Sequence, residues 1–201
     1  MNFYDVEKVL TKKGYSVVCF ETKEEATEYL ARSVENKTVG FGGSVTLREM
    51  GLYEALSEKN RVLWHWNVPE GADPAALRRE AALADVYISS VNGLAETGEI
   101  INIDGTCNRV SATLYGHERV IFVVGKNKLA PDYESALWRA RNIAAPRNAQ
   151  RLGVKTPCAV RAEKCYNCKS PDRICRALSV LWEKPGGARF EIVLVNEELG
   201  Y

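Results

Sequence analysis

The sequence predicts an α/β protein built on a largely parallel sheet that helices cover on both faces. Short, apolar, β-branched runs bounded by glycine recur along the chain, and segments of helical length separate several of them. Runs of this kind are typical of parallel strands buried between helices. A further observation concerns the C-terminus, where two alternating runs flank residues 185–188. This arrangement predicts an antiparallel β-hairpin at the end of the chain.

Six apolar runs precede that hairpin and predict the strands of the sheet. Each lies within a stretch of five to seven residues that is followed by a turn or a helix signal. In chain order, the runs lie within residues 15–20, 37–41, 61–66, 85–91, 98–103 and 119–125.

Five segments have the length and apolar spacing of helices, namely 1–14, 22–34, 46–58, 73–84 and 132–145. Gly14 ends the first helix, and Thr22 opens the second. Gly51 breaks or kinks the third, and Asp73 caps the fourth ahead of a proline in its first turn. Pro146 is expected to end or kink the fifth.

Length, composition and charge bound the class of protein. The 201 residues suit a single domain, 1–201, with 46% hydrophobic and 26% charged residues. The 27 basic and 26 acidic residues nearly cancel, which gives no indication of a nucleic-acid or membrane partner. The N-terminus has acidic residues and no long apolar run, so we expect neither a signal peptide nor a membrane span. These features favour a cytoplasmic protein.

The first chemically interesting loop follows the strand at 37–41. Gly42, Gly43 and Ser44 let the backbone approach a ligand closely, and a helix that begins there would point free N–H groups at an anion. Thr46 is the expected cap of that helix, with Glu49 completing a capping box. The loop lacks the residues of a P-loop or a dinucleotide fingerprint, and a tight turn from strand to helix is the alternative.

A second loop follows the strand at 85–91. Asn92, Thr97, Asn108 and Arg109 are candidate ligand-binding residues, and Glu96 is a candidate general base, nucleophile or ligand anchor. The alternative is that Glu96 is an exposed carboxylate and that the polar residues form turns.

A third loop follows the strand at 119–125. Asn127 is a candidate ligand-binding residue, and Lys128 is a candidate catalytic residue that would neutralise an anion held by the first loop. A solvated basic loop is the alternative. Four arginines further on, Arg139, Arg141, Arg147 and Arg151, have the spacing of a solvated helix face. With only two histidines in the chain, a histidine-based triad or a three-histidine zinc site is not expected.

Four of the six cysteines lie within residues 158–175, at the spacing C-x6-C-x2-C-x6-C. They are Cys158, Cys165, Cys168 and Cys175. Reduced thiols are the rule in the cytoplasm, which disfavours a disulfide framework. The central pair has the spacing that lets two thiolates reach one metal, so we expect an iron–sulfur cluster or zinc here. Four reduced packing thiols, or a labile Cys165–Cys168 disulfide, are the alternatives.

Several long stretches resemble the lactate-utilisation (LUD) domain family. They are VGFGGSVTLREMGL, SSVNGLAETGEIINIDGTCNRVSATLYGHERVIFVVGKNK, ARNIAAPRNAQRL and the C-terminal CYNCKSPDRICRALSVLWEKPGGARFEIVLVNEELGY, which is similar to the cysteine-bearing branch. The resemblance covers nearly all of the chain from Lys37 onward. It implies the three-layer α/β/α sandwich shared by ribose-5-phosphate isomerase, glucosamine-6-phosphate deaminase and CoA-transferases.

The resemblance also implies a role in the oxidation of lactate to pyruvate beside iron–sulfur partner subunits. Gly42, Gly43 and Ser44 would correspond in role to the anion-binding loop of the related enzymes, and Glu96 would lie near it. Fold and family do not settle an activity, so three hypotheses remain. The chain is an accessory, redox-associated component that binds a small anionic metabolite. Alternatively, it is an autonomous enzyme for a phosphorylated or CoA-linked substrate, or a scaffold that docks an iron–sulfur partner.

Overall fold

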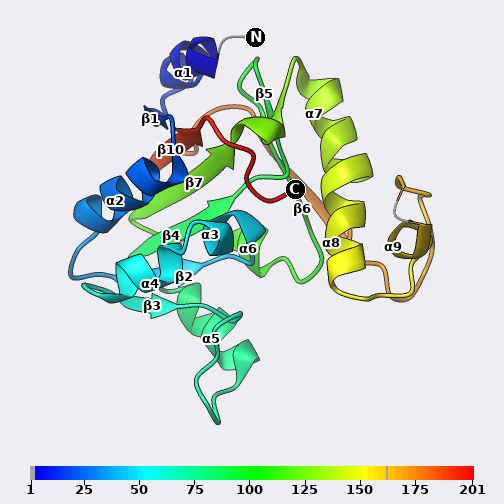
Figure 1. Cartoon of the computed structure of the whole chain (residues 1–201), viewed down its shortest axis with the longest axis horizontal. Helices are drawn as coiled ribbons and strands as arrows, with labels where there is room; N and C mark the ends of the chain where they lie inside the picture. Colours follow the sequence, from blue (N-terminus) through cyan, green and yellow to red (C-terminus); the bar gives the residue numbers. More distant parts are fainter. Residues whose placement is uncertain (1–2, 162) are drawn as a thin grey trace.

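Six parallel strands form the main sheet of the molecule (Figure 1). The computed structural model describes residues 3–161 and 163–201. The strands are β1 (Ser16–Phe20), β2 (Thr38–Phe41), β3 (Arg61–Leu63), β4 (Val86–Ser90), β7 (Arg119–Gly125) and β10 (Arg189–Val195). Their order across the sheet is β1-β10-β7-β4-β2-β3, and every neighbouring pair is parallel. The predicted parallel α/β sheet is therefore confirmed.

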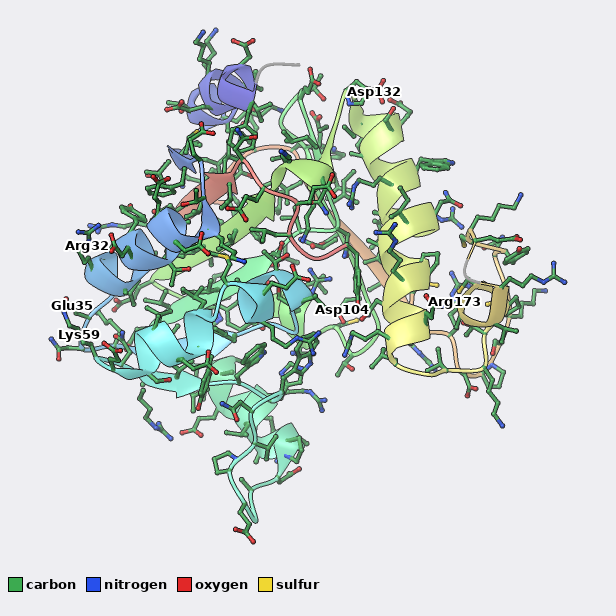
Figure 2. The ribbon with its side chains drawn as sticks, viewed as in Figure 1. Arg32, Glu35, Lys59, Asp104, Asp132 and Arg173 are labelled. Carbon is green, nitrogen blue, oxygen red and sulfur yellow. The ribbon has the colours of Figure 1, made fainter. Side chains whose placement is uncertain are left out.

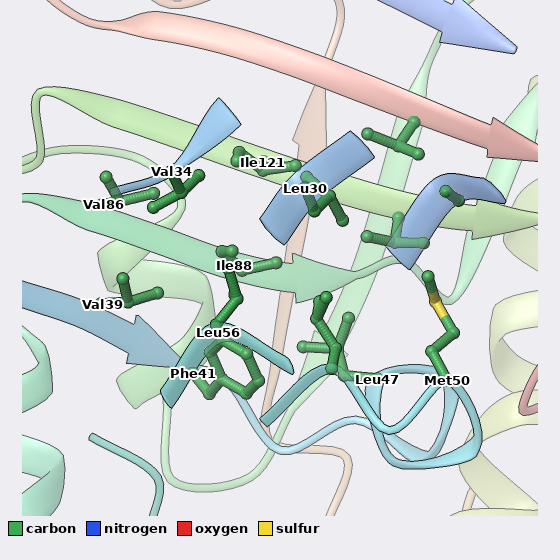
Figure 3. Close-up of a cluster of buried hydrophobic side chains, with 14 of the residues drawn as sticks. Leu30, Val34, Val39, Phe41, Leu47, Met50, Leu56, Val86, Ile88 and Ile121 are labelled. Carbon is green, nitrogen blue, oxygen red and sulfur yellow. The ribbon is translucent and has the colours of Figure 1, made fainter. Parts of the chain in front are cut away.

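One face of the main sheet packs against the helices α2 (Lys23–Ser33), α3 (Val45–Glu49) and α4 (Leu52–Ser57). Side chains alternate between the two faces of a strand, and Ile121 and Val123 of β7 point to this one. Figure 3 shows Leu30 of α2 and Leu56 of α4 in the same buried cluster as Ile88 of β4. Each such side chain contributes about 1.5–3 kcal/mol when it is fully buried, so this core holds the strand ends in place.

The opposite face is covered by helices and by a small second sheet. The helices are α1 (Phe3–Lys12), α5 (Pro74–Ala81) and α6 (Asn108–Ala112). The second sheet has the order β8-β5-β6-β9, from Leu129–Ala130, Gly93–Ala95, Ile100–Asp104 and Ala177–Leu181. Phe122 and Val124 of β7 pack here with Leu10 of α1 and Leu94 of β5. The main sheet thus lies between two layers, which confirms the predicted α/β/α architecture.

A helical column packs on the second sheet and continues past the predicted stop. It consists of α7 (Tyr133–Arg139), a π-helical turn (Ala140–Ala144) and α8 (Ala145–Arg151), which run on as one column in Figure 1. The sequence predicts an end or a kink at Pro146, because proline lacks an N–H and clashes with the preceding turn. The wider π-helical turn changes the hydrogen-bond pattern just before Pro146, and the proline lies in the first turn of α8.

The predicted C-terminal hairpin is wrong, although both of its strands exist. β9 pairs antiparallel with β6 in the second sheet, whereas β10 lies parallel between β1 and β7 in the main sheet. Six consecutive buried residues, from Phe190 to Val195, explain the placement of β10. A strand that is apolar on both faces belongs in the centre of a covered sheet, not in a hairpin at its surface.

Local signals in the sequence set several helix boundaries. Thr22 caps α2 in a full capping box with Glu25, and Asp73 caps α5 by accepting from the N–H groups of Ala75 and Ala76. Gly51 has a φ of +63° and separates α3 from α4, as expected for a residue that adopts the left-handed region easily.

The cysteine-rich segment begins with α9 (Pro157–Arg161). In the view of Figure 1, α9 and the loop that follows lie beyond α8, on the side away from the main sheet. None of the helices among the described residues combines the length and apolarity needed to cross a lipid bilayer.

Candidate functional site

A cleft of about 240 Å³ opens beyond the carboxyl ends of three parallel strands, β2, β4 and β7. Ser44 follows β2, Ser90 ends β4 and Lys128 follows β7, and all three line the cleft. Residues of α8 and the C-terminal Tyr201 also line it. Figure 1 shows the C-terminal tail running between the main sheet and the column of α7 and α8. Ligand sites of parallel sheets ordinarily form at this edge.

Basic side chains dominate the lining of the cleft. Those of Arg78, Arg109, Lys128 and Arg151 line it, and among the described residues Asp104 supplies the single acidic side chain. That carboxylate is already engaged, since its oxygens accept hydrogen bonds from three backbone N–H groups and approach Arg109 Nε at 3.8 Å. The cleft therefore favours an anionic ligand.

Lys128 is buried at the inner end of the cleft, with only 3% of its surface exposed. Its Nζ donates to Ser90 Oγ at 2.6 Å and to Thr46 Oγ1 at 2.7 Å. Burial lowers the pKa of this amine well below its usual value, and the nearby Arg139 and Arg109 guanidinium groups lower it further. The lysine that the sequence suggests as a simple positive charge is thus an amine that gives up its proton readily.

Arg109 is held as part of the cleft floor. Its guanidinium donates to the backbone oxygens of Ser90 and Ile103 and to the side-chain oxygens of Asn92 and Asn102. Asn92 Oδ1 also accepts from the Ile103 N–H at 2.7 Å. These partners orient the arginine and use up most of its donors, so Arg109 and Asn92 shape the cleft from within.

The glycine loop makes room for neighbouring side chains. A Cβ on Gly42 would lie 2.8 Å from Ser89 Oγ and 2.9 Å from Arg109 Cγ, and one on Gly43 would lie 3.1 Å from the Trp66 ring. Gly42 is not among the residues that line the cleft, whereas Gly43 is. Close packing therefore explains both glycines before any ligand is considered.

Ser44, and not Thr46, caps the helix that begins in this loop. Ser44 Oγ accepts from the Leu47 N–H at 3.3 Å, and Thr46 lies one residue inside α3, where its hydroxyl donates to the Leu199 carbonyl. The predicted capping box of Thr46 and Glu49 is therefore wrong. With a length of five residues, α3 adds little through its dipole, so side chains supply the positive charge of the cleft.

An aromatic wall closes one side of the cleft. Trp66 stacks on Trp64 with ring centroids 5.5 Å apart, and the Arg151 guanidinium lies 4.4 Å from the Trp66 ring. Arg151 also donates twice to Asn148 Oδ1, which fixes it between α8 and the wall. Burial lowers the pKa of the neighbouring His65 to about 4, so this histidine is neutral at physiological pH.

Several residues that the sequence singles out lie outside the cleft lining. Glu96 and Thr97 lie in the turn between β5 and β6, where Thr97 donates to Glu99. Asn127 holds the C-terminal tail by accepting from the Leu199 N–H and donating to the Gly200 carbonyl. Asn108 does line the cleft, together with Ser44, Asn92, Arg109 and Lys128.

The cleft also depends on residues whose importance the sequence did not reveal. Arg78 lines it, and its buried Nε has no hydrogen-bond partner among the described residues. Arg139 is buried, although its spacing suggests a solvated face, and it donates to the carbonyls of Asn92, Asn127 and Tyr201. Burial lowers the pKa of Arg139 to about 10. Arg151 lies in the resembling stretch at 140–152, but its spacing predicted a solvated helix face and gave it no role in the cleft.

The four clustered cysteines line a second cavity, of about 320 Å³. All six cysteines are free thiols in the part of the chain that the structure describes. Within that part, no three His, Cys, Asp or Glu side chains meet closely enough to hold one metal ion.

Comparisons with known proteins concern the whole chain. A family model described as the LUD domain matches residues 4–195. The crystal structure of a DUF162 family protein from Deinococcus radiodurans covers 96% of this chain and 94% of its own, with a TM-score of 0.55 and 14% identity. Ribose 5-phosphate isomerase from Plasmodium falciparum covers 54% of this chain and 52% of its own, with a TM-score of 0.35 and 16% identity. No curated protein gives a significant match. At 14% identity, the first of these structures supports the fold alone.

Proposed function

Because the chain belongs to the LUD domain family, we propose that it is a component of lactate or related organic-acid oxidation and binds a small anion in its cleft. The observation that carries this proposal is the lining of one cleft by four basic side chains and, among the described residues, by one acidic side chain that is already engaged. A volume of about 240 Å³ has room for an organic acid of a few carbons. Lactate and pyruvate each carry the single carboxylate that such a cleft would hold.

The anion would lie near Lys128, Arg151 and Arg78. A charge-assisted hydrogen bond contributes roughly 1.5–3 kcal/mol, so two or three of them suffice for a specific site. Ser44 and Asn148 line the same cleft and can donate to the remaining oxygens. An anion beside Lys128 would also raise the pKa of the buried amine again, so binding is coupled to the uptake of a proton.

Two basic side chains with lowered pKa values, His65 and Lys128, line the cleft. Oxidation of a 2-hydroxy acid to a 2-oxo acid releases two electrons and two protons, and either side chain would accept one of these protons in its neutral form. The electrons need an acceptor, so the proposed component works with iron–sulfur partner subunits. Turnover only after those partners are added is the expected result. Turnover by the purified chain alone would favour the autonomous-enzyme hypothesis instead.

Calorimetric titration with lactate, pyruvate and inorganic phosphate tests the binding proposal. Arg151→Gln and Arg78→Gln should each weaken binding of the preferred anion about tenfold, the loss expected for one charge-assisted contact. Two control variants should bind like the unmodified protein. Arg32→Gln removes an exposed arginine paired with Glu28, and Glu96→Gln neutralises an acid outside the cleft lining. The proposal fails if none of the three anions binds, or if the control variants weaken binding as much as the cleft variants do.

A further inference from the structure

The cavity lined by the clustered cysteines lies apart from the β-sheet edge and has its own chemistry. Cys158 lies on α9, Cys165 and Cys168 lie in the loop that follows, and Cys175 lies just before β9. Four thiols from one segment of eighteen residues thus line one cavity of about 320 Å³. The other two cysteines, in β1 and at the start of α6, are not among its lining residues.

Hydrogen-bond donors surround the sulfur atoms. Arg173 Nε lies 3.1 Å from Cys175 Sγ, and the Asn167 N–H lies 3.4 Å from Cys165 Sγ. Arg141 Nη2 approaches the same Cys165 sulfur at 3.8 Å. N–H groups directed at sulfur stabilise the negative charge of a thiolate-ligated cluster.

The charge of the cavity lining also favours a negatively charged group. Arg141, Arg173 and Arg176 line the cavity, and none of its described lining residues is acidic. A group held by four thiolates carries net negative charge, which these arginines would offset. Apolar side chains, among them Ile103 and Leu178, also line the cavity.

The spacing of the thiols favours a cluster over a single ion. A zinc ion with Zn–S bonds of about 2.3 Å requires its four sulfurs about 3.8 Å apart around one point. Among the described residues, no three His, Cys, Asp or Glu side chains meet closely enough to hold one ion. A cluster binds its cysteine ligands at different iron atoms, so its four sulfurs lie farther apart.

We propose that the four cysteines of residues 158–175 ligate an iron–sulfur cluster. When bound, the cluster would supply a one-electron redox couple. The sequence contains no other recognisable motif for a redox group. Its position gives that couple a use. Ile103, Ala145 and Ile174 line both cavities, so a single wall of apolar side chains separates the cluster from the cleft. In the view of Figure 2, Asp104 of the cleft and Arg173 of the cysteine cavity lie on either side of α8. The inference stands on the cysteine cavity itself and does not require an anion in the cleft.

The test is elemental analysis of the full chain, purified without oxygen and reconstituted with ferrous iron and sulfide. We expect iron and acid-labile sulfide in equal amounts, at about two or four atoms of each per chain, with visible absorption and a paramagnetic signal after reduction by dithionite. Cys165→Ser and Cys168→Ser should lose most of the iron and the signal. Cys19→Ser and Cys107→Ser are the matched controls and should keep both.

Three results would overturn the proposal. They are one zinc per chain without sulfide, iron that persists in Cys165→Ser and Cys168→Ser, and folded protein that stays metal-free after reconstitution. If a serine variant fails to fold, alkylation of the unmodified loaded protein decides the question. The four clustered thiols should then be protected until the metal is chelated, and full reactivity before chelation would contradict the proposal. Folded Cys165→Ser should still bind anions in the cleft. Failure of the cluster proposal can therefore be distinguished from failure of the proposed anion binding.

Discussion

Lys128 places an amine where water barely reaches it, close to two guanidinium groups. Arg139 of α7 and Arg109 of α6 lower its pKa. Among the described residues, Glu49 of α3 is the acid that raises it. Its hydrogen bonds to Thr46 and Ser90 orient it without supplying a negative partner. The side chain therefore costs stability in the empty protein, which is typical of a group kept for binding or catalysis.

This cost has a defined dependence on pH. The folded-state pKa of Lys128 is lowered, so between that pKa and the ordinary value of about 10.4 the unfolded chain binds a proton that the folded chain does not. The contribution of Lys128 to the free energy of unfolding must then rise with pH, by at most about 1.4 kcal/mol per pH unit. Chemical denaturation between pH 7 and 10 compares the unmodified protein with Lys128→Met. The free energy of unfolding of the unmodified protein should rise with pH relative to that of Lys128→Met. Lys126→Met, at an exposed position of the same turn, should show no such trend. A difference that is flat or falls with pH would contradict the account of Lys128.

Single residues of the cleft were only partly predictable from the sequence. Ser44, Asn92 and Lys128 line it because they follow β2, β4 and β7, whose carboxyl ends meet at one edge of the main sheet, whereas Asn108 and Arg109 reach it from α6, after β6 of the second sheet. Burial was not predictable, since it depends on contacts between distant segments. For this reason Lys128 was expected to be charged and Arg139 to be solvated.

At the scale of elements, the helices and strands that could be predicted are those with a signal in their own stretch of sequence. Strands such as β4 and β7 are continuous apolar runs, and caps such as Thr22 and Asp73 act within one turn. The short strands β5 and β8 were missed, since pairing across the second sheet makes them strands and no periodicity can show in two or three residues. The same reason explains the wrong hairpin, because the partners of β9 and β10 are far away in the sequence.

The contact between β5 and α7 gives an element-scale prediction. A Cβ on Gly93 would lie 2.6 Å from the backbone oxygen of Ala136, and neither backbone can move without disturbing the second sheet. Gly93→Ala should therefore lower the free energy of unfolding by about 1–3 kcal/mol, the usual cost of overpacking. Gly186→Ala is the control, since a Cβ there would meet nothing within 4 Å. Equal unfolding midpoints for Gly93→Ala and the unmodified protein in denaturant would show that the contact is looser than described.

At the scale of the whole molecule, the parallel sheet and the second sheet with its helical column create two adjacent cavities. The cleft lies at the edge of the main sheet, and the cysteine cavity lies on the other side of a shared apolar wall. The architecture could be predicted from strand and helix patterns, but the adjacency could not. It depends on the second sheet and on the path of the chain from α8 through α9 to β9, which have no signature in periodicity.

The central claim is that the cleft binds a small anion beside Lys128. Calorimetric titration of the preferred anion at pH 8–9, in two buffers of different ionisation enthalpy, tests it most directly. His65, with a pKa of about 4, stays neutral at this pH and does not contribute to the proton uptake that is measured. The account predicts that the unmodified protein takes up a fraction of a proton, at most one, per anion bound and that Lys128→Met takes up none. Binding without proton uptake in the unmodified protein, or equal uptake in Lys128→Met, would place the anion elsewhere.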